Sequence, residues 1–145
     1  MEKDIFVIAE IKIITQTMTN ENPVLEAKRY VENARAILRE KARKEDDQYT
    51  DRKYVKLAGH AAYTGVLVAL DGFLGVKTKK RKDVTWYKEQ LASLDKKVLN
   101  NFVNAYELLH LYMGYDGTRE AAVAQAGLKR ADEIIQWVEQ RSAVC

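Results

Sequence analysis

The chain of 145 residues has little cysteine, proline or glycine: one Cys, one Pro and seven Gly. The single cysteine, Cys145, is the last residue, so neither an internal disulfide nor a cysteine-based zinc site can form. Few prolines and glycines argue against a disordered or linker-like chain and favour helices. These features predict a globular protein of a reducing compartment, and we expect the bacterial cytoplasm.

Long apolar runs are also missing. None approaches the roughly 20 uninterrupted residues of a membrane span. The N-terminal stretch MEKDIFVIAEIKII is interrupted by Glu10 and Lys12 and is too short for a secretory segment. We therefore expect no membrane partner.

Several motifs of enzyme chemistry are absent. The chain has no glycine-rich phosphate loop, no GxSxG and no HExxH. These absences remove several large enzyme classes, so the sequence predicts no catalytic residues and no cofactor, and favours a non-enzymatic role.

Positive charge is concentrated in one run. The net charge is +3, and KTKKRK at residues 77–82 contributes +5 of it, which leaves −2 (3 − 5) elsewhere. Trp86 and Tyr87 follow, and basic residues beside aromatic ones are typical of nucleic-acid contacts. A solvated connecting loop explains the same run, and we favour it. The candidate nucleic-acid-binding residues are Lys77, Lys79, Lys80, Arg81 and Lys82.

The chain divides into an N-terminal extension, residues 1–21, and a single domain, residues 22–141. Ile5 to Ile13 alternates like a strand, although Val7, Ile11, Ile14 and Met18 also fit a helical stripe. We prefer the strand because β-branched residues dominate it. No second strand is apparent elsewhere, so this one requires a partner from another molecule or stays loose. Translation from Met18 would omit the first 17 residues.

Helical periodicity covers most of residues 22–141. Asn22 and Pro23 are typical of a helix start, and Asp51 opens a second helix that runs to about Gly75. This second helix is apolar around most of its circumference, which predicts a central position or cover by a second subunit. Its line of small residues predicts close approach of another backbone: Ala58, Ala62, Gly65, Ala69 and Gly72.

The second half of the domain contains further helices. Asp83 or Thr85 can cap the next one, and Ser93 or Asp95 can start a new turn, so one kinked helix or two short ones both fit. Gly114 is expected to stop this region, and the last helix follows Thr118. The sequence therefore predicts an all-α, up-and-down bundle of four to five helices with a short N-terminal extension.

Two groups of polar residues on the helices could carry chemistry. Glu107 and His110 form a Glu-x-x-His pair like those of di-iron bundles, but the further pair and glutamates that such sites need are absent, so we predict no metal site. His60, Thr64 and Asp71 are spaced to share one side of the second helix. They are either a ligand-binding strip inside the bundle or a polar edge whose groups bond to neighbours, and we favour the polar edge. The candidate ligand-binding residues are His60, Thr64, Asp71 and His110.

The residue pattern of the first two predicted helices resembles that of the first two helices of HEPN-type domains. It is found in VLEAKRYVENARAILRE and in the following KYVKLAGHAAYTGVLVALDGFLG. The chain is also similar to a small uncharacterised bacterial family of helical proteins. HEPN ribonucleases carry an arginine four to six residues before a histidine. Here seven residues separate Arg52 from His60, so that motif is absent. The resemblance implies a non-catalytic, dimerising bundle that binds a nucleotide-like ligand or a partner such as a nucleotidyltransferase-like protein.

The leading functional hypothesis is a non-enzymatic, homodimeric binding or interaction module. The alternative is a nucleic-acid-binding or diverged HEPN-type, RNA-directed protein that uses His60 or His110 together with the basic loop 77–82. We expect the exposed face of the second helix, or the N-terminal strand, to form the dimer contact.

Overall fold

The computed structural model of the chain describes residues 22–76 and 82–142. The predicted N-terminal strand, Met18 and Cys145 lie outside the described residues. So do four of the five candidate nucleic-acid-binding residues: Lys77, Lys79, Lys80 and Arg81.

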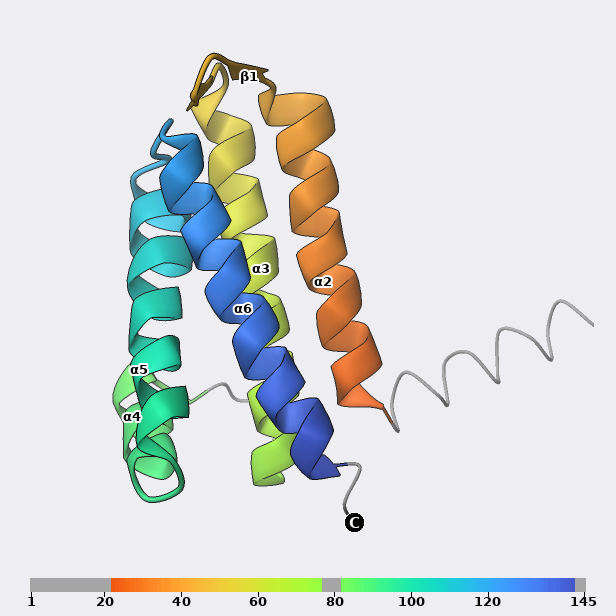
Figure 1. Cartoon of the computed structure of the whole chain (residues 1–145), viewed down its shortest axis with the longest axis vertical. Helices are drawn as coiled ribbons and strands as arrows, with labels where there is room; N and C mark the ends of the chain where they lie inside the picture. Colours follow the sequence, from red (N-terminus) through yellow and green to blue (C-terminus); the bar gives the residue numbers. More distant parts are fainter. Residues whose placement is uncertain (1–21, 77–81, 143–145) are drawn as a thin grey trace, which may run out of the picture.

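The described residues form an up-and-down helical bundle, which confirms the predicted all-α fold (Figure 1). The chain rises through α2, returns through α3, rises again through α5 and its continuation η2, and descends through α6 (Figure 1). The elements are α2 (Pro23–Ile37), η1 (Leu38–Ala42), β1 (Lys44–Glu45), β2 (Gln48–Tyr49), α3 (Arg52–Leu74), α4 (Val84–Ala92), α5 (Lys96–Ala105), η2 (Tyr106–Tyr115) and α6 (Ala121–Ser142).

Side-chain caps start four of these helices where the sequence predicts them. Asn22 accepts from the N–H of Leu25, and Pro23 occupies the first helical position of α2. Asp51 caps α3 and Asp83 caps α4. The carboxylate of Asp95 accepts two backbone N–H groups at the start of α5, so the third helical region is two helices and not one kinked helix.

The two short strands were not predicted, because each is only two residues long and three of the four residues are polar or charged. They pair antiparallel, with Lys44 opposite Tyr49. The pair is held by a contact distant in sequence: the N–H of Tyr49 donates to the carbonyl of Arg119 at 2.7 Å, and Nε of Arg119 donates to the carbonyl of Tyr49 at 2.8 Å. This hairpin covers one end of the bundle (Figure 1).

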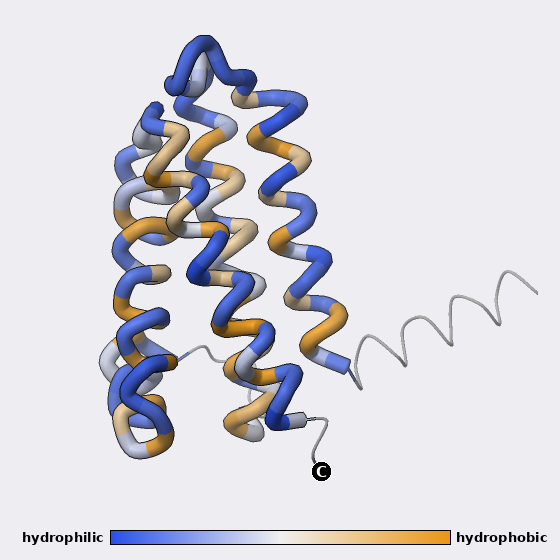
Figure 2. Tube along the Cα trace, viewed as in Figure 1, coloured by the Kyte–Doolittle hydropathy of each residue, from blue (hydrophilic) through white to orange (hydrophobic). Residues whose placement is uncertain are grey.

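Helix α3 is the centre of the bundle and contacts α2, η2 and α6. Two of its small residues lie close to α2: a methyl group on Gly65 would lie 2.8 Å from the carbonyl oxygen of Ala27, in line with the predicted close approach of another backbone, and one on Gly72 would meet the ring of Pro23. Along each helix, apolar residues recur on the side that faces the interior of the bundle, and polar residues lie between them (Figure 2). Close backbone approach therefore accounts for the glycines in this helix.

By length and composition alone, α3 is also long and apolar enough to cross a membrane. It is not an uninterrupted apolar run, because Lys56, His60 and Asp71 lie within it, and so the sequence pattern did not predict such a segment. The central helix of a bundle meets the same criterion, and the packing of α3 against three neighbours explains its apolar character.

Gly114 was predicted to stop this helix, and the helix ends one residue later, at Tyr115. Gly114 is buried inside η2, a π-helical stretch that continues α5 and ends at Tyr115. The chain turns at Gly117, which has a φ of 64°, a conformation that glycine adopts without strain. Gly114 has a packing role, because it brings η2 close to the imidazole of His60.

Candidate functional site

A cavity of about 300 Å³ lies between α3, η2 and the start of α4. Three of the four candidate ligand-binding residues, His60, Thr64 and His110, line it together. We call it the histidine cavity. Its other lining residues are Tyr63, Leu67, Lys82, Val84 and Tyr106.

His110 lies among aromatic rings in this cavity. Its imidazole stacks on Tyr106 with ring centroids 5.2 Å apart and lies 5.0 Å from the ring of Tyr63. The ring of His60 meets it edge-on at 6.3 Å. Nδ1 of His110 is buried and has no hydrogen-bond partner among the described residues. Buried polar atoms are nearly always paired, so an unpaired nitrogen at this position is unusual and lacks a hydrogen bond that another group would have to supply.

The protonation state of His110 follows from the same surroundings. Burial lowers the pKa of His110 below its ordinary value of 6.5, and the nearby charge of His60 lowers it further. At neutral pH the imidazole of His110 is therefore uncharged. A neutral imidazole has one N–H donor and one nitrogen acceptor, so His110 can form hydrogen bonds with a polar group without adding charge to the cavity.

A π-helix carries His110 into position. The i→i+5 pattern of η2 is rare over ten residues and is frequently found at functional sites. Gly59 of α3 makes room for it, since a methyl group there would lie 2.6 Å from the carbonyl of Leu109 and 2.7 Å from the N–H nitrogen of Gly114. Thus η2 packs directly on α3 at the level of the two histidines.

Lys82 contributes a positive charge to the rim of the cavity. It is exposed, precedes α4, and is the one residue of the basic loop that the structure describes. Its Nζ lies 5.8 Å from the centroid of Trp86. Nζ of a second lysine, Lys88, lies 6.0 Å from the ring centroid of Tyr106. The cavity therefore combines aromatic walls with a cationic edge.

Asp71 is separate from this cavity. Its Oδ1 accepts a 2.6 Å hydrogen bond from the hydroxyl of Tyr87 in α4. Asp71 and His60 share a side of α3, but eleven residues of helix separate them by about 16 Å along the axis. Asp71 thus matches the polar-edge alternative, in which the carboxylate bonds to a neighbouring helix.

The geometry does not assemble a metal centre from the described residues. Glu107 of the Glu-x-x-His pair is exposed, and no carboxylate lines the cavity beside His60 and His110. Within residues 22–76 and 82–142, no group of three or more His, Cys, Asp or Glu residues is placed to hold an ion. Two imidazoles alone fall short of the three or four protein ligands that zinc takes.

Two tyrosines that line the histidine cavity, Tyr63 and Tyr106, were not among the predicted ligand-binding residues. Tyr63 and Tyr106 are half-buried, and both pack around His110. Tyr106 and His110 are four residues apart on one helix, which is the spacing at which side chains meet, so this pair was visible in the sequence. The approach of Tyr63 depends on the packing of α3 against η2, which sequence spacing does not reveal.

Comparisons with known proteins identify relatives of this bundle. A family model described as "Domain of unknown function (DUF5618)" matches residues 22–140. A solved structure, described as a protein of unknown function from Dyadobacter fermentans, is 60% identical, with a TM-score of 0.79 over 83% of this chain and 96% of that one. No curated protein matches the chain.

Proposed function

Since the chain belongs to the DUF5618 family, whose description assigns no activity, we propose from its structure that it is a non-enzymatic binding module. The ligand site is the histidine cavity. The observation that carries this proposal is Nδ1 of His110, which is buried among aromatic rings and has no hydrogen-bond partner within the described part of the chain. An unpaired buried polar atom costs free energy, and a ligand that pairs with it removes that cost.

The lining residues define the chemical class of the ligand. Tyr63 and Tyr106 provide aromatic faces for a planar ring, and His110 offers a hydrogen-bonding nitrogen beside them. Lys82 at the rim attracts a negative charge. A planar heterocycle that carries an anionic group, as a nucleotide does, satisfies these features together. This class agrees with the nucleotide-like ligand that the HEPN resemblance implies.

Calorimetric titration with adenosine 5′-monophosphate tests this proposal, with adenosine and ribose 5-phosphate as partial ligands. His110→Phe keeps an aromatic ring in place but removes both nitrogens, so we expect at least about tenfold weaker binding. Lys82→Ala should weaken binding of the nucleotide and leave the affinity for adenosine unchanged. The matched control is Lys129→Ala, an exposed lysine of α6 outside the cavity. Equal affinity of the wild type and His110→Phe would overturn the proposal.

A second candidate function is binding of RNA or single-stranded DNA through the basic loop. It is favoured by the position of Lys82, which joins the end of that loop to the two histidines. Binding of an oligonucleotide that falls steeply with salt, and is lost when Lys79, Lys80 and Arg81 become alanine, supports it. Binding that is absent or insensitive to salt excludes it.

The proposal includes a homodimer formed through α3. Leu57 is 49% exposed, and Ala61 and Val68 are half-buried on the same side of that helix. An apolar stripe of this kind on a central helix suits a second copy of the chain.

A further inference from the structure

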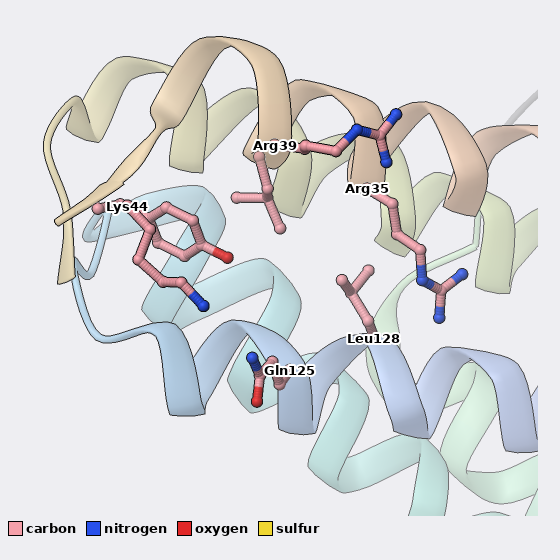
Figure 3. Close-up of a pocket in the computed structure, with 7 residues that line it drawn as sticks. Arg35, Arg39, Lys44, Gln125 and Leu128 are labelled. Atoms are coloured by element: carbon pink, nitrogen blue, oxygen red, sulfur yellow. The ribbon is translucent and has the colours of Figure 1, made fainter. Parts of the chain in front are cut away.

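A second pocket, distinct from the histidine cavity, lies between α2 and α6 beneath the β1–β2 hairpin. It encloses about 370 Å³, which is within the range of small-molecule sites, about 300 to 1,000 Å³. One wall comes from Arg35 of α2 and from Leu38 and Arg39 of η1, which follows it, and the other from Gln125 and Leu128 of α6. Lys44 and Tyr49 of the hairpin close one end. We call it the hairpin pocket (Figure 3).

The hairpin pocket has an apolar floor. Leu38, Tyr49 and Leu128 are only 4%, 7% and 7% exposed, and they fill the space between the two helices. Burial raises the pKa of Tyr49 above its ordinary value of 10.0, so its hydroxyl keeps its proton at neutral pH and remains a donor. The floor therefore suits a hydrocarbon or aromatic body with a polar end.

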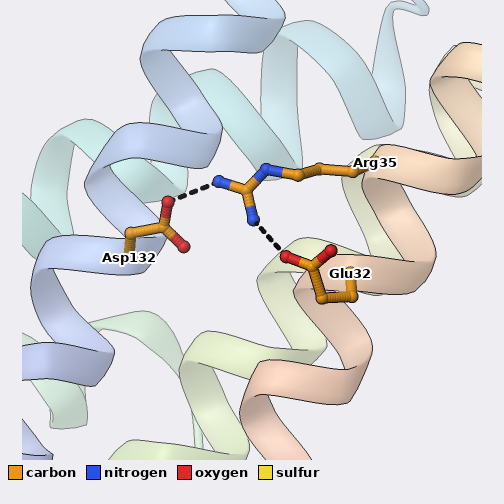
Figure 4. A network of polar contacts seen from close by, with 3 residues as sticks. All are labelled: Glu32, Arg35 and Asp132. Carbon is orange, nitrogen blue, oxygen red and sulfur yellow. Dashed lines mark hydrogen bonds and ion pairs between the residues drawn. The ribbon is translucent and has the colours of Figure 1, made fainter.

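The charged lining residues are all cationic. Arg35 is already engaged: it pairs with Glu32 at 3.0 Å and with Asp132 of α6, and so ties the two walls together (Figure 4). Among the described residues, Arg39 pairs only with the neighbouring Glu40, at 3.5 Å, and both side chains are more than 60% exposed. Such surface pairs contribute little, so Arg39 can turn to another anion.

Lys44 is an exposed cation at the hairpin end of the pocket. It extends from the hairpin toward Gln125 of α6 (Figure 3), and it makes no ion pair within the described part of the chain. A strongly hydrated ammonium beside an apolar floor gains no internal partner there. An anionic group entering the hairpin pocket would supply one.

The backbone next to Lys44 is strained. Arg43 has φ 52° and ψ 136°, a combination that is essentially restricted to glycine. Thr50 holds it there, because the backbone N–H of Thr50 donates to the carbonyls of both Ala42 and Arg43, and its hydroxyl donates to Ala42 at 2.8 Å. Strain of this kind persists where the surroundings enforce it and collects at functional sites. Here it directs the chain into the strand that carries Lys44.

From the cationic rim, the apolar floor and the strained support of Lys44, we propose that the hairpin pocket binds a small organic anion. This ligand has an apolar body, about the size of one aromatic ring, and a carboxylate or phosphate group. The body packs on Leu38 and Leu128, while the anionic group pairs with Lys44 and Arg39 and accepts from Gln125 or Tyr49. The site shares no lining residue with the histidine cavity.

Titrations followed by amide NMR test this proposal with four probes: benzoate, phenyl phosphate, inorganic phosphate and benzyl alcohol. We expect saturable binding of benzoate or phenyl phosphate, with shifts at Lys44, Tyr49 and Leu128, and much weaker binding of the two partial probes. Lys44→Ala and Arg39→Ala should each weaken binding about tenfold. The matched controls, Lys41→Ala and Arg29→Ala, replace exposed residues outside the pocket and should change nothing.

Three results would overturn the proposal. The first is no saturable shift by either aromatic anion up to about 10 mM. The second is equal affinity for inorganic phosphate and phenyl phosphate. That result would show that surface charge alone attracts the anion and that the aromatic ring makes no favourable contact with the apolar floor. The third is unchanged affinity in Lys44→Ala. Because His110→Phe alters only the histidine cavity, retained benzoate binding in that variant separates this site from the proposed function.

Discussion

The hydroxyl of Tyr87 donates a 2.6 Å hydrogen bond to the carboxylate of Asp71 and so joins α4 to the central helix. Tyr87 is 1% exposed, and its ring packs on Phe102 at 5.7 Å. This contact fixes α4 next to the histidine cavity, since Val84 at the start of the same helix lines it. Asp71 therefore supports the site from outside the cavity.

Tyr87→Phe should reduce the free energy of unfolding by about 1 to 2 kcal/mol, because the ring remains and the hydroxyl that donates to a partly buried carboxylate is lost. Urea denaturation measures the change. Tyr115→Phe is the control, since Tyr115 is 77% exposed and its hydroxyl is solvated. Equal stability of Tyr87→Phe and the wild type would show that this hydrogen bond does not hold α4.

Gly59→Ala should destabilise the protein by about 1 to 3 kcal/mol, although alanine is normally the better helix former by about 1 kcal/mol. The added methyl would meet backbone atoms of Leu109 and Gly114 at 2.6 and 2.7 Å, and backbone atoms cannot move aside cheaply. Gly127→Ala is a graded control, because its nearest neighbour is the flexible end of the Leu109 side chain. Thermal unfolding should rank Gly59→Ala as the less stable variant.

Arg43→Gly should stabilise the protein by about 1 kcal/mol. Glycine removes strain of about 1 to 3 kcal/mol at φ 52° and adds an entropic cost of about 0.5 to 1 kcal/mol. Lys41→Gly, in the preceding helical turn, should instead destabilise by about 1 kcal/mol. If both glycine substitutions destabilise equally in urea denaturation, Arg43 is not strained, and strain does not position Lys44.

The pKa of His110 predicts how stability depends on pH. Because folding lowers this pKa below 6.5, the unfolded chain binds the proton more readily, and the free energy of unfolding falls as the pH decreases from 6.5 toward the folded pKa. His110→Phe has no imidazole to protonate at this position, so its free energy of unfolding should fall less over the same pH range. Urea denaturation of both proteins at about pH 7.5 and 5 measures the difference. Parallel losses would contradict the depressed pKa.

The proposed dimer can be tested by mass in solution. Leu57→Glu places a charge on the exposed apolar side of α3 and should convert a dimer into single chains in light scattering. Gln136→Glu, on the exposed surface of α6, is the matched control and should keep the dimer. Deletion of residues 1–17 tests the alternative contact: an unchanged mass would exclude the N-terminal segment as the interface.

Local chemistry made much of the fold predictable. Asn22, Asp51, Asp83 and Asp95 start helices because their side chains cap the first N–H groups, and these signals lie within four residues of sequence. The hairpin was missed because Arg119, distant in sequence, provides its stabilising hydrogen bonds. Local residue types that suit a strand are nearly absent from it.

The candidate site was predictable only in part, for a geometric reason. Helical spacing predicts that His60, Thr64 and Asp71 share one side of α3, but it does not say which of them another element contacts. The π-helix brings His110 to the first two, whereas Asp71 meets α4. The hairpin pocket could not be predicted, because its cations come from three elements, α2, η1 and β1, and its floor requires α6.

The most direct test of the account is the NMR signal of the side-chain nitrogens of His110, recorded at neutral pH with and without adenosine 5′-monophosphate. The structure predicts a neutral imidazole in the free protein and a saturable change at Nδ1 when the nucleotide binds. Nitrogen signals of His110 that stay unchanged at nucleotide concentrations up to about 10 mM would contradict a ligand site at this histidine.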